Sequence, residues 1–95
     1  MVRATWNDEV IAESDSTVTL EGNHYFPPDS VRWELLRDAP KQSVCPWKGA
    51  AGYYDVVVGD EVAATAAWAY PTPLPAAENI MGHVAFWKGV SVAEG

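Results

Sequence analysis

Short runs of apolar residues that alternate with polar ones, separated by turn-forming pairs, constrain this fold more than any other feature. Asn7-Asp8, Gly22-Asn23 and Gly59-Asp60 supply the turns. Successive side chains of a strand point to opposite faces, so the pattern predicts half-buried strands joined by hairpins. The strands are expected over 2–6, 10–12, 17–21, 24–26, 53–58, 62–70 and 83–87, with 90–92 as a candidate edge strand.

Prolines restrict helices to short pieces. Pro27-Pro28 ends one strand, and a short helix is expected over 31–36, in a unit that Pro40 closes. The prolines within 71–75 enforce an extended loop before a helical turn over 76–80. Several short strands with so few helices predict a small antiparallel barrel or sandwich. The chain shows no repeat or linker, and we expect one domain over 1–95.

Composition narrows the classes of partner. Thirteen acidic against six basic side chains give a formal charge of -7, which would repel nucleic acid and anionic membranes. The single cysteine excludes an intrachain disulfide. There is no apolar stretch of about 18 residues, as a membrane span needs, and no signal-peptide pattern at the start. We therefore expect a cytoplasmic protein with neither nucleic acid nor membrane as a partner.

The segment Cys45-Pro46-Trp47-Lys48-Gly49 combines a thiol, an amine and a ring in a stretch that we expect to be irregular. A nucleophilic Cys45 would need His24 or His83 as its base, whereas a buried cysteine would act as a small apolar residue. Lys48 could hold an anionic group beside Gly49, which would let a ligand approach the backbone, or it could be a solvated lysine. The few Cys and His residues fit no usual zinc site, so no metal or cofactor is expected.

Aromatic residues are the strongest indication of a binding site. Five Trp, four Tyr and two Phe exceed what a core of this size requires. Trp68 and Tyr70 would share one strand face, and such rings either build the core or form walls for a flat or cationic ligand. Asp55 could orient Lys48 or face solvent. The expected ligand-binding residues are Trp47, Lys48, Tyr54, Trp68 and Tyr70, with Asn23 as a polar contact and Tyr25 and Trp87 as outer walls.

Several motifs together resemble a bacterial family catalogued as domain of unknown function 427. They are Trp6-Asn7, 11–14, Glu21-Gly22-Asn23, 25–28, 45–49, Tyr53-Tyr54, 68–71, Ile80 and 84–86, in the family's order and over essentially the whole chain. The resemblance implies a mainly β, antiparallel β-tent or barrel-like fold of two sheets with one or two short helices. Relatives of that fold include the thalidomide-binding domain of cereblon, which holds ligands in a tryptophan cage.

Two features linked to the resemblance do not transfer to this sequence. The family's nucleotidyltransferase-type label would need an acidic pair for magnesium and a phosphate-cradling loop, and neither is present. The paired zinc-binding cysteines of many β-tent proteins are also missing. A small-molecule-binding domain is therefore the favoured function. The alternatives are a small enzyme, either nucleotidyltransferase-type or dependent on Cys45 or Lys48, and a protein-interaction module or homodimer.

Overall fold

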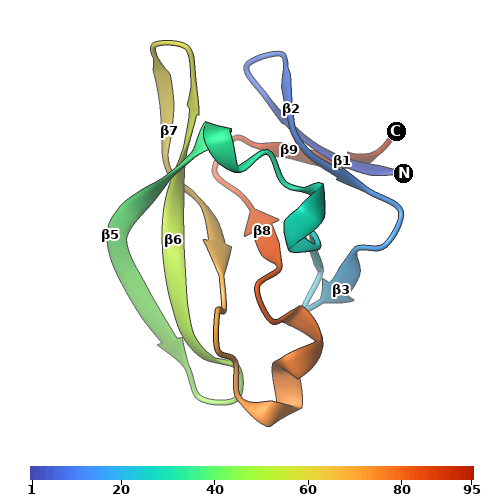
Figure 1. The fold of residues 1–95 in the computed structure, drawn as a ribbon, viewed down its shortest axis with the longest axis vertical. Helices are drawn as coiled ribbons and strands as arrows, with labels where there is room; N and C mark the ends of the chain where they lie inside the picture. The colour runs from blue at the N-terminus through green and yellow to red at the C-terminus, as the bar shows by residue number, and fades with distance from the viewer.

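Three antiparallel sheets make up the structure, a computed structural model that describes residues 1–95 (Figure 1). The first sheet has the order β2-β1-β9 and joins β1 (Val2–Trp6), β2 (Glu9–Ser14) and β9 (Ser91–Glu94). Asn7 and Asp8 have φ angles of 52° and 65°, the left-handed conformation that a tight hairpin turn requires. The predicted first hairpin is therefore confirmed. The two chain ends lie side by side at the end of this sheet opposite the β1–β2 turn (Figure 1).

The other sheets differ greatly in size. β3 (Val18–Leu20) and β4 (Asn23–Tyr25) form a two-stranded sheet, while the third has the order β5-β6-β7-β8 and contains β5 (Leu36–Cys45), β6 (Gly49–Val58), β7 (Glu61–Ala69) and β8 (Val84–Phe86). The mainly β, antiparallel fold is confirmed, and the sheets do not close into a barrel. There are three sheets and not two, because the backbone of the short β3–β4 hairpin pairs with the third sheet only at an isolated bridge between Phe26, which follows β4, and Val84 of β8.

The helical segments are all 3-10 turns: η1 (Pro28–Ser30), η2 (Trp33–Leu35) and η3 (Pro75–Ile80). The helix expected over 31–36 is reduced to η2, because Val31 forms a bridge with Ala12 of β2 and Leu36 already begins β5. No helix has the length and apolar character that a membrane crossing requires.

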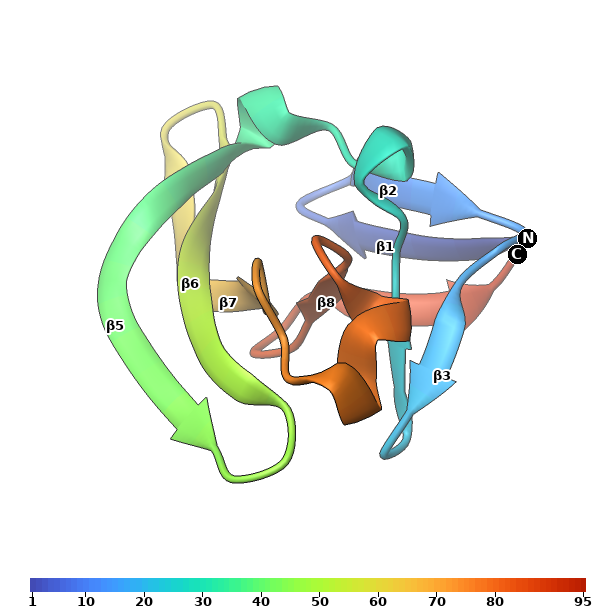
Figure 2. The same cartoon turned by 60° about the horizontal axis from the view of Figure 1, so that its bottom comes forward.

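Strand β5 corrects the expectation that Pro40 closes a unit, whereas the segment expected to be irregular is a turn at 46–48 between β5 and β6. Pro40 lies in the middle of β5, where the pairing with β6 shifts register between Ala39 and Gln42. A proline has no N–H for a ladder, so it is tolerated at a bulge and on an edge strand, and β5 is the edge of its sheet. Figure 2 shows β5 curving around the outside of β6.

The third sheet has a hydrophobic cluster on each face. Tyr54 and Phe86 pack into the larger cluster, which includes residues of β1 and β2. On the other face, Trp68 and Ala85 pack with a smaller cluster that contains Tyr25 and residues of η3. The sheet therefore separates a central core from a second, ring-rich one.

The alternation predicted for 62–70 is interrupted. Trp68 and Tyr70 share a face as expected, but Ala66 lies in the opposite cluster. The reason is a register shift between Tyr54 and Val56, opposite which Thr65 adopts a φ of 52°. Such a bulge reverses which side chains face inward.

Candidate functional site

A cavity of about 180 Å³ lies on the ring-rich face of the third sheet, next to the β3–β4 hairpin. Its lining residues are Asn23, Tyr25, Lys48, Tyr53, Trp68, Tyr70 and Trp87. Five of them are aromatic, and Lys48 is the only one with a charge. The sheet supplies several walls directly, because Tyr53 of β6 lies opposite Trp68 of β7 in the strand register.

The rings pack mostly edge to face. Trp68 meets Trp87 at 5.3 Å between ring centroids and Tyr25 at 6.1 Å, with planes at 68° and 90°. The Trp68 Nε1–H also donates a hydrogen bond of 3.2 Å to the Tyr25 hydroxyl. Tyr53 lies 6.3 Å from Trp87 at a tilt of 36°. These contacts hold the walls in defined orientations, which favours a preformed cavity.

Trp87 is positioned by the bulge in β7. Its Nε1–H donates a 2.6 Å hydrogen bond to the Thr65 carbonyl, and the Thr65 amide donates one of 2.8 Å to Asp55 Oδ1. This amide, followed by a hydrogen bond from Arg37, holds the pKa of Asp55 below its usual value. Asp55 thus neither orients Lys48 nor simply faces solvent. It supports the wall that carries Trp87.

Lys48 is the only buried charged residue in the chain, at 8% exposure. Its ammonium lies 5.4 Å from the centre of the Tyr70 ring and 5.5 Å from that of Trp47, and it forms an ion pair with Glu21. Burial by itself lowers the pKa of Lys48, but the hydrogen bond that Lys48 donates to Glu21 and the fields of Tyr25 and Tyr70 outweigh it, so the pKa is raised. Lys48 is therefore a charged ammonium at neutral pH. The sequence did not reveal Glu21 as its partner, because no spacing pattern links two residues in separate hairpin turns.

The turn that carries Lys48 is held by the loop after β7. The Leu74 amide donates a 2.8 Å hydrogen bond to the Lys48 carbonyl. Gly49 has a φ of 106°, and a Cβ there would lie 3.3 Å from the Leu74 nitrogen. The protein's own backbone thus approaches Gly49 closely on the side where a Cβ would point.

The structure brings together Asn23, Tyr25, Lys48, Trp68, Tyr70 and Trp87, but it leaves Trp47 and Tyr54 out of the cavity lining. Trp47 is 38% exposed in the hairpin turn beside Lys48. Tyr54 points to the opposite face, where its ring meets Trp33 at 5.7 Å. Tyr53 takes the expected place of Tyr54. Only the register with Trp68 reveals which member of the pair faces the cavity.

The thiol and the two histidines have separate surroundings. Cys45 is half-buried and packs against the cluster of Tyr25 and Tyr70. His24 Nδ1 lies 2.9 Å from the Thr17 hydroxyl, and His83 Nδ1 lies 2.9 Å from a backbone carbonyl. The Nδ1 atom of each histidine therefore already has a local partner. No group of three or more His, Cys, Asp or Glu side chains is placed to hold a metal ion.

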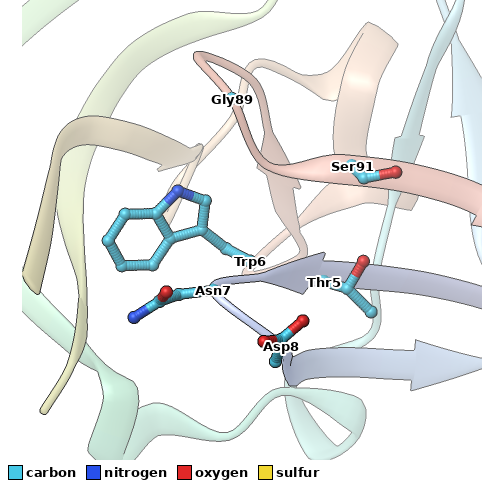
Figure 3. Close-up of a pocket in the computed structure, with 6 residues that line it drawn as sticks. All are labelled: Thr5, Trp6, Asn7, Asp8, Gly89 and Ser91. Carbon is cyan, nitrogen blue, oxygen red and sulfur yellow. The ribbon is translucent and has the colours of Figure 1, made fainter.

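A larger hollow of about 440 Å³ lies at the β1–β2 turn and is lined by Thr5, Trp6, Asn7, Asp8, Gly89 and Ser91 (Figure 3). Trp6 is its only hydrophobic wall. Asn7 and Asp8 are accounted for by the turn that they form. Binding sites for small molecules usually combine apolar walls with a few polar groups, so the smaller aromatic cavity is the stronger candidate.

Comparison with known protein families identifies the family of this chain. The family model described as a domain of unknown function (DUF427), which also carries a nucleotidyltransferase-type label, matches residues 1–94, and the chain belongs to this family. No curated protein matches the sequence.

Proposed function

We propose that this member of the DUF427 family binds a flat small molecule about the size of one ring in the aromatic cavity. The observation that carries the proposal is the convergence of five rings and one buried ammonium on a cavity of about 180 Å³. An engineered protein cavity of about 150 Å³ holds one benzene molecule, so the volume suits a single ring with a small substituent. Asn23 and Lys48 supply the polar contacts.

The partial exposure of the walls distinguishes them from an ordinary core. Tyr25 and Tyr70 are buried at 1% and 5% exposure, whereas Trp87 is 40% exposed and Tyr53 and Trp68 are half-buried. Adjacent rings that are left partly in water indicate a surface that gains free energy when an apolar partner covers it. A stacked ligand would provide that cover.

Binding is preferred to catalysis because of how the reactive groups are arranged. A nucleophilic Cys45 would need a base in hydrogen-bond reach, and neither histidine is hydrogen-bonded to Cys45: His24 contacts Thr17 and His83 contacts a backbone carbonyl. The expected cytoplasmic location stays a prediction.

The test is a titration of ¹⁵N-labelled protein with benzamide, followed through the indole N–H signals. We expect the signals of Trp68 and Trp87 to shift in a saturable way while that of Trp33 stays in place. Trp68→Leu should abolish the saturable shift at Trp87. Trp33→Leu is the matched control, because Trp33 lies on the other face of the sheet, and it should leave binding intact. If benzamide and related single-ring compounds shifted neither cavity indole, the proposed function would be wrong.

A further inference from the structure

The ion pair between Lys48 and Glu21 joins a buried group to an exposed one. Lys48 lines the cavity at 8% exposure, whereas the Glu21 side chain is 49% exposed and is not among the lining residues. Glu21 reaches Lys48 from the β3–β4 turn, where it has a φ of 52° and precedes Gly22 with a φ of 80°. The carboxylate therefore approaches the ammonium from the solvent side. If it leaves Lys48, water can solvate it.

An ammonium has three N–H donors, and the only anionic acceptor that contacts that of Lys48 is Glu21. Its other neighbours are the faces of Tyr70 and Trp47, which attract a cation but are weaker acceptors than a carboxylate. A second anionic oxygen that entered the cavity would find the ammonium already oriented and partly desolvated. The surroundings of Lys48 thus favour binding of an anionic ligand group.

We propose that the ligand is a ring-bearing carboxylate whose anionic oxygens take the place of Glu21 on Lys48, so that Glu21 acts as an internal competitor. The inference rests on the proposed function and specifies its ligand class. Lys48 keeps an anionic partner throughout the exchange, and Glu21 returns to water. A cationic ligand would be repelled by the buried ammonium and should bind most weakly. A neutral ligand would leave the Glu21 pair in place and bond to Lys48 more weakly.

The first test compares benzoate, benzamide and benzylamine on the unaltered protein, with the Trp68 indole signal as the readout. Benzoate exchanges the half-exposed Glu21 pair for a hydrogen bond inside the cavity, where charged hydrogen bonds are less weakened by water, so benzoate should bind several-fold, at most about tenfold, more tightly than benzamide. Benzylamine should bind most weakly. If benzamide bound as tightly as benzoate, the ring cavity would stand and the carboxylate inference would be wrong. If none of the three bound, the proposed function would fail as well.

The second test uses Glu21→Gln, which removes the competing charge. We expect benzoate to bind on the order of fivefold more tightly, in the usual range for coupled sites, while the affinity for benzamide is unchanged. Glu34→Gln is the matched control because it makes the same change in net charge at a residue paired with Arg32. Unchanged or weaker benzoate binding in Glu21→Gln would overturn the role of Glu21 as a competitor.

Lys41 and Lys88 also lie near rings of the site, at 5.4 Å from the centre of Tyr53 and 5.0 Å from that of Trp87. Lys48→Met tests whether Lys48, and not Lys41 or Lys88, binds the carboxylate. The substitution should remove the preference for benzoate over benzamide. If a folded Lys48→Met protein kept that preference, Lys48 would not be the anchor and the inference would be wrong.

Discussion

Gly49→Ala is the substitution for which the structure gives the most specific expectation. Gly49 has a φ of 106°, which an L side chain rarely adopts, and its new Cβ would lie 3.3 Å from the nitrogen of Leu74. That nitrogen belongs to backbone that is itself hydrogen-bonded to the Lys48 carbonyl at 2.8 Å, so it cannot move away without loss. The substitution therefore combines backbone strain with a contact that is too close.

Two other glycines separate these effects. Gly22 has a φ of 80° but open space around its Cβ position, and Gly52 has open space and no positive φ. We expect Gly22→Ala to cost about 1–2 kcal/mol from the left-handed backbone alone. Gly49→Ala should cost about 3 kcal/mol, since overpacking adds at least about 1 kcal/mol. Gly52→Ala should be neutral or slightly stabilising, because glycine within a strand is unfavourable by up to about 1 kcal/mol relative to alanine.

Urea unfolding followed by tryptophan fluorescence measures these differences. A loss of about 3 kcal/mol is a large part of the roughly 5–15 kcal/mol expected for a domain, and it corresponds to a fall in Tm of about 12–24 °C. The order Gly49→Ala, Gly22→Ala, Gly52→Ala, from most to least destabilised, is the expected result. Equal losses at Gly49 and Gly22 would show that Leu74 does not press on Gly49, and the account of how the Lys48 turn is held would be refuted.

Three further predictions concern the two faces of the third sheet and its edge. Tyr53→Leu should weaken ligand binding, while Tyr54→Leu should leave the Kd unchanged but lower the free energy of unfolding by about 1–2 kcal/mol, as equilibrium titration and urea unfolding will show. Because the Thr65 amide lowers the pKa of Asp55, this group stabilises the fold above about pH 4, the ordinary value. That stabilisation should be lost as the pH falls further. Urea unfolding between pH 5 and pH 2.5 should therefore show a free energy of unfolding that falls with pH, and falls less steeply in Asp55→Asn. Pro40→Val should restore an N–H to the exposed edge of β5 and promote concentration-dependent association in light scattering, and a strictly monomeric variant would argue against this protective role of Pro40.

The parts of the fold that could be predicted from the sequence are those where alternation and turn chemistry agree. The hairpin around Asn7-Asp8 is an example, since both residues tolerate the left-handed conformation that the turn needs. Strand β5 was missed because its sequence contains Pro40 and little alternation. It is formed through pairing with β6, which no local pattern shows. The helix expected over 31–36 failed for the same kind of reason, as the bridge from Val31 to β2 overrides local preference.

The residues of the candidate site also fall into those that a local pattern predicts and those that it does not. The two-residue period was enough to place Trp68 and Tyr70 on one face. It could not choose between Tyr53 and Tyr54, because that choice depends on the register between β6 and β7. Glu21 was missed because its contact with Lys48 joins two hairpin turns far apart in the sequence. Local patterns thus identify rings and strands, while cross-strand register and contacts between turns decide which groups meet.

The bulge opposite Asp55 links the fold to the site. With regular pairing through β7, Ala66 would share a face with Trp68, as the sequence suggested, and Thr65 would lie in the ladder. In the structure the Thr65 carbonyl instead accepts the Trp87 indole N–H, and the Thr65 amide satisfies Asp55. Bulges recur next to functional sites because they redirect side chains at the expense of local pairing. Here the bulge places the most exposed ring of the cavity, Trp87, over Trp68. Trp87 gains less free energy from packing than a fully buried ring would, and a ligand laid against its exposed part would add the rest.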